Sequence, residues 1–205
     1  MKNRYFSLLI IICVGLSNLY SCDSDSSVID EKSLEKLIIK ETSRSQRYDS
    51  IVYGVKLGMS SDDFFHYVDK AHRDGLFYPS RGNKMVKIEL NKGFDHPVNF
   101  EFFPANVESN LTPLKQFKAG ISYINYSTYN QEMTLIKLLK QSIQFFENGY
   151  KGNKFLKVPN NDDVFVKYNY IKIDANRLIL IEPSSALNEL NIIFEDLNPL
   201  GFSKN

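Results

Sequence analysis

Apolar and polar residues alternate along several short segments of this 205-residue chain, and this alternation constrains the fold more than any other feature. In residues 86–90, Val, Ile and Leu alternate with Lys and Glu, and in residues 98–102, Val and two Phe alternate with Asn and Glu. Residues 190–195 show a similar alternation. A period of two places the apolar side chains on one face of a β-sheet and the polar side chains on the other. We therefore expect an antiparallel sheet with one face against a core and one face in water.

Two helical segments lie among these strands. The first starts with Ser60 and Asp63, a variant of the capping box, and ends at Gly75, a residue type suited to a left-handed position after a helix. The second, residues 131–148, has apolar side chains at helical spacing, and Gly149 follows it. Further strands are predicted at residues 51–57, 120–127, 164–173, 177–182 and 189–195.

This order of elements predicts an α+β fold in which two helices pack on one face of an antiparallel sheet. The order strand, helix, strand, strand occurs twice, and an extra strand follows at the C-terminal end. We therefore expect a duplicated unit, although the two halves share little sequence identity.

The N-terminal residues have the layout of an exported precursor. Lys2 and Arg4 precede an apolar run at residues 6–16, which is too short to span a membrane. The motif Leu19-Tyr20-Ser21-Cys22 that follows resembles the lipobox of bacterial lipoprotein precursors. The resemblance implies that Cys22 receives a diacylglyceryl group, that residues 1–21 are removed, and that the new amino terminus is acylated. The alternatives are a conventional secretory signal with an incidental cysteine and a buried apolar helix.

Three regions are therefore expected: a signal peptide at residues 1–21, a polar tether at 22–47 with a short amphipathic helix at 30–42, and a single α+β domain at 48–205. Without residues 1–21 the chain has 23 Lys and Arg against 24 Asp and Glu, a net charge of −1, so no basic excess favours nucleic acid. Cys13 leaves with the signal peptide and Cys22 would be lipidated. No disulfide or zinc thiolate site is therefore expected.

A second resemblance lies at the start of the first main helix. Gly58-Met59-Ser60 is similar to the strand-to-helix junction of small outer-membrane assembly lipoproteins and of β-lactamase-inhibitor-like domains. Both families pack helices on one face of an antiparallel sheet. They act by binding other proteins, which is only an analogy for this chain, because the resemblance itself implies architecture and not activity.

The sequence shows no catalytic, metal or cofactor motif. His66 and His72 are six residues apart on one helix and point in different directions, and His96 lies in a turn. We therefore expect a lipid-anchored, exported envelope protein that acts as a binding or accessory module. Its contacts would be the membrane, through the lipid on Cys22, and a partner protein, with a glycan as the weaker candidate. An inhibitor or immunity-like protein is a special case, and the alternative is a hydrolase or other enzyme that no motif reveals.

Tyrosines are the predicted partner-binding residues. Tyr123, Tyr126, Tyr168 and Tyr170 lie on predicted strands or just beyond them. Tyrosine is favoured at protein interfaces because it combines a large apolar area with a polar hydroxyl group. We expect these four side chains on the open face or edge of the sheet.

Two short motifs bear on the compartment. Asp49-Ser50-Ile51 resembles the O-glycosylation motif of Bacteroidetes-type envelopes, which implies a glycan on Ser50. Asp23-Ser24-Asp25 resembles the surface-export signal of the same group, whereas an aspartate directly after the lipidated cysteine resembles the inner-membrane retention signal of enterobacteria. The resemblances imply different locations, so surface, periplasmic and outer-membrane display all stay open.

Overall fold

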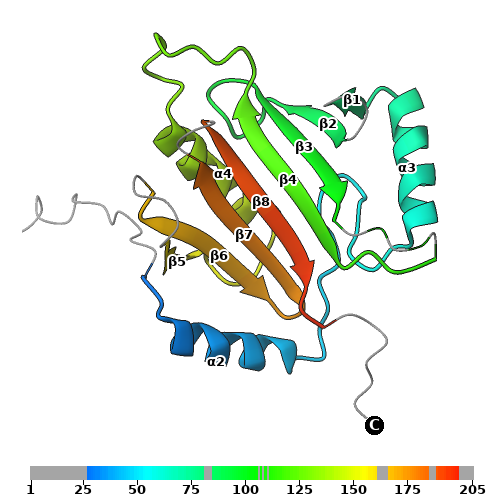
Figure 1. Ribbon diagram of the computed structural model, residues 1–205, viewed down its shortest axis with the longest axis vertical. Helices are drawn as coiled ribbons and strands as arrows, with labels where there is room; N and C mark the ends of the chain where they lie inside the picture. The colour runs from blue at the N-terminus through cyan, green and yellow to red at the C-terminus, as the bar shows by residue number, and fades with distance from the viewer. Residues whose placement is uncertain are drawn as a thin grey trace, which may run out of the picture.

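The computed structural model describes residues 27–80, 85–105, 107, 109, 111–160, 166–184 and 188–198. Eight strands form one antiparallel sheet in the order β1-β2-β3-β4-β8-β7-β6-β5 (Figure 1). The elements are α2 (Glu31–Thr42), α3 (Ser61–Arg73), β1 (Tyr78–Ser80), β2 (Met85–Leu90), β3 (Val98–Pro104), β4 (Gln116–Tyr123), α4 (Leu135–Gly149), β5 (Leu156–Pro159), β6 (Tyr168–Asp174), β7 (Arg177–Ser184) and β8 (Glu189–Asp196). The predicted α+β fold is confirmed. Within the described part of the chain, no helix has both the length and the apolar composition needed to cross a membrane.

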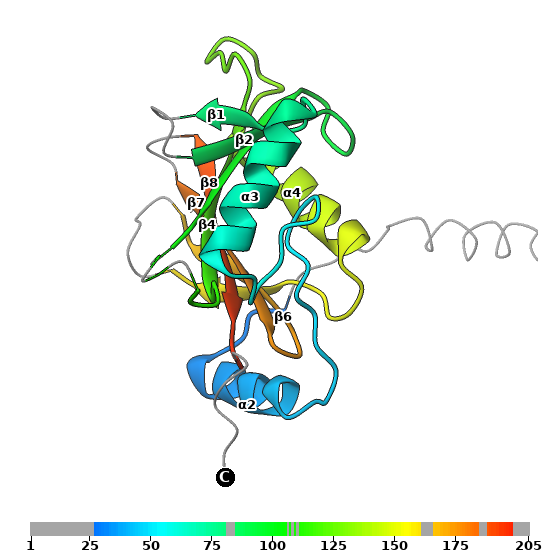
Figure 2. The same cartoon turned by 90° about the vertical axis from the view of Figure 1, so that its right-hand side faces the viewer.

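Helices α3 and α4 lie on the same face of the sheet, as predicted (Figure 2). Phe64 of α3 and Phe146 of α4 belong to one hydrophobic core with the inward side chains of the strands. The Phe64 ring meets Phe117 of β4 edge to face, with centroids 5.6 Å apart, and Phe146 meets Phe194 of β8 at 5.8 Å. This aromatic core supplies the apolar burial that holds the two layers together.

The ends of helices α3 and α4 can be compared with the capping residues predicted from the sequence. Ser60 Oγ accepts a hydrogen bond from the backbone N–H of Asp63 at 3.0 Å, and Gly75 follows α3 with a φ of 73°. These observations confirm the predicted cap and stop. Helix α4 begins at Leu135, four residues later than predicted, because residues 127–133 form successive turns. Thr134 caps α4 by accepting a hydrogen bond from Lys137 N at 3.3 Å.

The predicted strand at residues 51–57 is wrong. The segment is a tight turn in which Ile51 N donates to Val55 O at 2.9 Å, and Tyr53 and Gly54 have φ angles of 41° and 86°. Its aliphatic side chains are buried, whereas Tyr53 is exposed, so the apolar run reflects a turn folded into the core and not a strand. The observed order is therefore one helix followed by four strands, twice, and not strand, helix, strand, strand. The two sets of strands meet where β4 pairs with β8, and the duplication itself stays a prediction.

Helix α2 packs on the opposite face of the sheet. Its Leu34, Leu37 and Ile38 contact a second apolar cluster that includes Ile171 of β6 and Leu178 of β7. Adjacent strand residues point to opposite faces, and the neighbouring Ile179 belongs to the core beneath α3 and α4. Helix α2 therefore covers the other face, over the end of the sheet formed by β5, β6 and β7.

The predicted helix at residues 30–42 is thus present, but the polar tether predicted for residues 22–47 is not what the structure shows from residue 27 onward. Ile29 N donates to Lys157 O at 2.9 Å, and Lys157 N donates to Ser27 O at 3.2 Å, so the segment lies along the outer edge of β5. An apolar stripe on α2 finds an apolar patch on the outer face of the sheet, and burying both stabilises the contact. Residues 27–47 are therefore part of the domain, while Cys22 lies outside the described residues.

Candidate functional site

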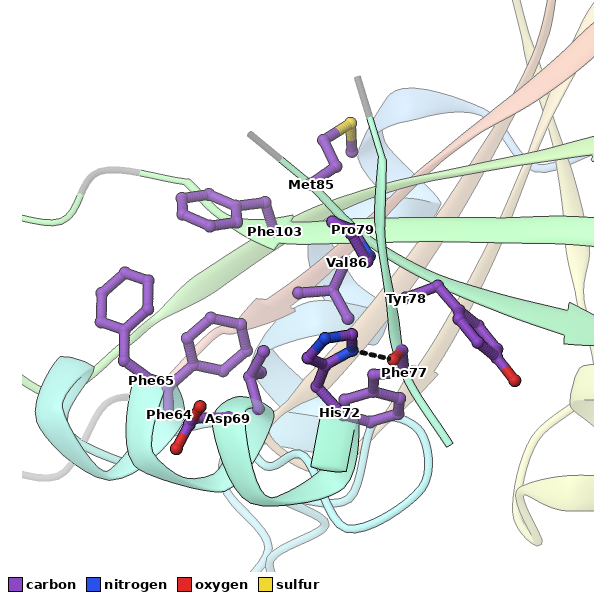
Figure 3. Close-up of a pocket in the computed structure, with 11 residues that line it drawn as sticks. Phe64, Phe65, Asp69, His72, Phe77, Tyr78, Pro79, Met85, Val86 and Phe103 are labelled. Carbon is purple, nitrogen blue, oxygen red and sulfur yellow. Dashed lines mark hydrogen bonds between the residues drawn. The ribbon is translucent and has the colours of Figure 1, made fainter. Parts of the chain in front are cut away.

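An apolar concavity lies between α3, the edge strand β1 and its neighbour β2, with a volume of about 310 Å³ (Figure 3). We call it the α3 groove. Its lining includes Phe65, Val68, Asp69 and His72 from α3, and Tyr78, Met85 and Phe103 from the sheet. Most of these side chains are apolar, so the groove is suited to an apolar group from a partner.

Two consecutive phenylalanines create the rim of the groove. Neighbouring residues on a helix point about 100° apart, so Phe64 and Phe65 cannot both enter the core. Phe64 is completely buried, whereas Phe65 is 43% exposed and rests against Phe103, with ring centroids 5.9 Å apart. Figure 3 shows Phe65 at one end of the groove and Tyr78 near the other. A pair of adjacent aromatic residues at the start of a helix is the sequence signal for this site, because only one of the two can enter the core.

Among the described residues that line the groove, few are polar. His72 Nδ1 donates to the backbone carbonyl of Phe77 at 2.8 Å, which leaves Nε2 free to accept a hydrogen bond or, when protonated, to donate one. The Asp69 carboxylate pairs with Arg73, one turn further along α3. This arrangement could orient a bound group, and the described lining residues include no nucleophile held next to a base.

The edge of the sheet beside the groove is a poor template for adding a strand. Strand β1 has only three residues, and its central residue, Pro79, has no backbone N–H to donate. Short edge strands that contain proline protect a sheet against edge-to-edge pairing. A partner at this edge would therefore be recognised through side chains in the groove and not through backbone pairing.

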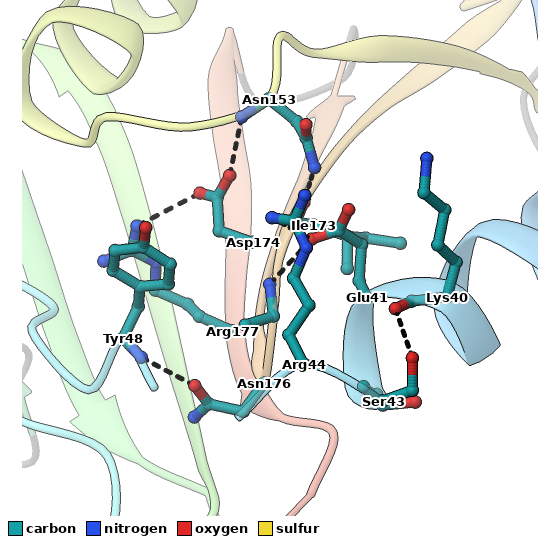
Figure 4. Close-up of polar contacts among 12 residues, drawn as sticks. Lys40, Glu41, Ser43, Arg44, Tyr48, Asn153, Ile173, Asp174, Asn176 and Arg177 are labelled. Carbon is teal, nitrogen blue, oxygen red and sulfur yellow. Dashed lines mark hydrogen bonds and ion pairs between the residues drawn. The ribbon is translucent and has the colours of Figure 1, made fainter. Parts of the chain in front are cut away.

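A cluster of buried charged and polar residues surrounds Asp174 at the turn between β6 and β7 (Figure 4). The Asp174 carboxylate accepts hydrogen bonds from Lys172 Nζ at 3.0 Å, from the Arg177 guanidinium at 3.1 Å and from Asn153 N at 2.8 Å. The three charged side chains are almost completely buried. Gly152 allows the close approach, because a Cβ at this position would lie 2.2 Å from Asp174 Oδ1.

Two aromatic rings hold the Arg177 guanidinium in this cluster. Its central carbon lies 4.3 Å from the Tyr150 ring centroid and 5.3 Å from that of Tyr48, and Nη1 donates to Ser50 O at 3.0 Å. Burial raises the pKa of Tyr150, and the nearby Arg177 charge opposes this effect. The cluster connects residues 48–50 and 150–153 to the sheet. Because protein groups surround its charges, we interpret it as structural and not as a catalytic site.

The four predicted tyrosines do not form one surface. Tyr123 is only 5% exposed and Tyr170 packs against the same core, so both lie on the face that α3 and α4 cover. Tyr126 is exposed in the loop after β4, and Tyr168 is half-buried at the start of β6, with its ring centroid 5.9 Å from Lys157 Nζ. Strands β8 and β7 separate β4 from β6, so the predicted placement of the four on one open face is wrong.

The remaining predicted positions are distributed as follows. Ser50 is exposed, and the neighbouring Asp49 carboxylate accepts hydrogen bonds from Arg47 at 3.1 Å and from Asn176 at 3.2 Å. Glycosylation of Ser50 stays a prediction, as does lipidation of Cys22. In the parts of the chain that the structure describes, no group of three or more His, Cys, Asp or Glu side chains could hold a metal ion.

Comparison of the chain with known family models, with curated proteins and with solved structures found no match. Its function is therefore argued from the α3 groove and the N-terminal signals alone.

Proposed function

We propose that this chain is a lipid-anchored, exported envelope protein that binds a partner protein through the α3 groove. The observation that supports this function best is an apolar groove with partly exposed aromatic residues, Phe65 and Tyr78, at its ends. Protein interfaces obtain most of their binding energy from a few aromatic or aliphatic anchors seated in such pockets.

The size and lining of the groove favour a protein partner over a glycan. Its volume of about 310 Å³ is at the lower limit for small-molecule pockets, which span roughly 300–1,000 Å³. Sugar recognition requires several converging polar groups, whereas here Asp69 is paired with Arg73 and one nitrogen of His72 is bonded to the backbone. The partner we infer presents one or two large apolar side chains, as the target of an inhibitor or immunity-like protein also would.

The lipid anchor is tested through the two cysteines of the chain. Cys22→Ala should abolish metabolic labelling with fatty acids, because the thiol is the attachment point for the diacylglyceryl group. Cys13→Ala, within the expected signal peptide, is the matched control and should leave labelling intact. Labelling that survives in the Cys22 variant would exclude this anchor. Protease added to intact cells then distinguishes surface display from a periplasmic location.

The groove is tested by crosslinking in the native envelope. Truncating both Phe65 and Tyr78 to alanine should reduce the yield of a crosslinked partner about tenfold or more, because losing an anchor residue typically weakens an interface by over 1 kcal/mol. The control carries Tyr129→Ala and Ile136→Ala, which remove two exposed apolar side chains from the loop before α4 and from α4 itself. Thermal melting of both variants checks that each remains folded.

Undiminished crosslinking by the folded groove variant would contradict the proposed site. A loss confined to the control variant would assign the contact to the loop that follows β4, where Tyr126 is also exposed. A loss in neither variant would exclude both surfaces.

A further inference from the structure

Helix α2 presents a row of lysines to solvent. Lys32, Lys36 and Lys40 follow one another at intervals of four residues, which places them along one side of the helix. The apolar stripe of α2 packs against the sheet on the opposite side. Beside this row, one turn after Glu35, lies Ile39, an apolar side chain that is 68% exposed. We call this side, formed by Lys32, Lys36, Ile39 and Lys40, the outer face of α2.

The position of α2 on the domain is firmly defined. Just before its first residue, Ile29 N donates a hydrogen bond to Lys157 O of β5 at 2.9 Å. At its other end, the buried Glu41 carboxylate accepts a hydrogen bond from Ala175 N at 3.0 Å and pairs with Arg44 at 3.0 Å. Because both ends of α2 are held, its outer face has a fixed direction relative to the sheet.

The distance between this face and Cys22 is limited by the chain itself. Residue 27 already pairs with β5, so residues 22–26 alone connect Cys22 to the folded domain. A segment of this length spans at most about 18 Å when fully extended. A flexible tether over residues 22–47 would instead average about 25–30 Å and leave the orientation of the domain free. A lipid on Cys22 would therefore bring α2 next to the bilayer.

We propose that the outer face of α2 binds the phosphate groups of anionic phospholipids in the membrane that holds the anchor, with Ile39 entering the interface. The proposal rests on the lipid anchor of the proposed function. Clusters of lysine close to a membrane attachment point are attracted to anionic lipids, and an exposed apolar side chain among them adds interfacial contact. Glu31 and Glu35 lie on the flank of the helix, between the lysine row and the buried stripe, so they do not interrupt the row.

This orientation has a consequence for the α3 groove. Strands β5 and β1 are the two edges of the eight-stranded sheet. Seven strand spacings of about 4.8 Å separate them, which is roughly 34 Å. With β5 and α2 at the bilayer, the groove beside β1 lies at the edge of the sheet farthest from the anchor, where a partner can reach it.

The first test uses the chain from Cys22 onward, which contains every described residue and in which Cys22 is the only thiol. Cys22 is coupled to a maleimide lipid, so the test does not depend on whether cells lipidate this residue. One set of vesicles contains phosphatidylcholine and phosphatidylglycerol, and the other contains phosphatidylcholine alone. Acetylation of each lysine is then measured by mass spectrometry.

On the anionic vesicles, Lys32, Lys36 and Lys40 should react about fivefold more slowly than on the neutral vesicles. Lys70, Lys92 and Lys118, which are exposed on α3, a loop and β4, should react equally on both. Equal reactivity of the lysine row on the two vesicle types would overturn the proposal. Slow acetylation of the lysine row on both vesicle types would also overturn the proposal. It would show that closeness to the bilayer shields the lysines without any contribution from lipid charge.

The second test uses the same chain with its thiol blocked, so that no anchor contributes. Its flotation with anionic vesicles should fall about tenfold in a variant with Lys32→Gln, Lys36→Gln and Lys40→Gln. The matched variant with Lys70→Gln, Lys92→Gln and Lys118→Gln has the same net charge and should keep the binding. Equal losses in both variants would overturn a specific contact at α2. If Cys22 is not labelled with fatty acids in cells, the lipid anchor of the proposed function is wrong. The flotation result does not depend on that outcome, so the two proposals fail separately.

Discussion

Three hydrogen bonds converge on the buried carboxylate of Asp174. It pairs with both Lys172 and Arg177, two cations that are almost completely removed from water, and it also accepts a hydrogen bond from the backbone of Asn153. A buried ion pair contributes little when compared with an apolar substitute, but removing one partner leaves the other charge uncompensated. Asp174 is therefore important for stability mainly because its removal would leave the charges of Lys172 and Arg177 buried without a counterion.

We expect Asp174→Asn to reduce the free energy of unfolding by about 3–5 kcal/mol, because two buried cations would lose their counterion. Lys154→Gln is the matched control. It removes a salt bridge to Glu147 in which the lysine side chain is exposed, and such pairs contribute about 0–1 kcal/mol. Urea denaturation of the two variants measures both values. A similar, small effect of both substitutions would show that the Asp174 cluster is not needed for stability.

Helix α2 is the element whose role changed most between sequence and structure. Its amphipathic pattern fits a tether with some helicity as well as a packed helix, because the same stripe of Leu34, Leu37 and Ile38 supports both. The structure buries this stripe against β6 and β7, and thereby joins the N-terminal segment to the domain.

Two neighbouring isoleucines test this packing. Ile38→Ala removes a side chain packed against the sheet and should lower the free energy of unfolding by about 1–2 kcal/mol. Ile39→Ala removes an identical side chain from the exposed side of the same helix. It should change the free energy of unfolding by less than about 0.5 kcal/mol. Amide hydrogen exchange of α2 should also accelerate only in the Ile38 variant. If the two substitutions behave alike, residues 31–42 do not pack against the sheet.

The whole molecule places two surfaces at opposite edges of one sheet. The N-terminal segment and α2 occupy the β5 edge, and the α3 groove occupies the β1 edge. The continuous pairing of β4 with β8 at the centre joins the two sets of four strands. A sheet that is rigid across this centre can present a groove at one edge while the other edge is held at a membrane, which is the arrangement that the two proposals require.

Periodicity and capping signals predicted the fold class, the two helices on one face and most of the strands. These signals are local: Ser60 contacts a backbone group three residues away, and alternation shows which side chains share a face. The prediction failed for residues 51–57, where an apolar run fits a buried turn as well as a strand.

Only the tertiary structure decided which faces are covered. Alternation already places Tyr123 on the same face as Ile121, but whether helices cover that face depends on contacts between residues far apart in the sequence. The same is true of Phe65, which stays at the rim because Phe64 takes the place in the core, and of Asp174, whose partners come from separate segments. The sequence by itself therefore determined most of the helices and strands and the expected export signals. Strand order and packing, which arise from long-range contacts, decided where the groove, the buried charges and the outer face of α2 lie.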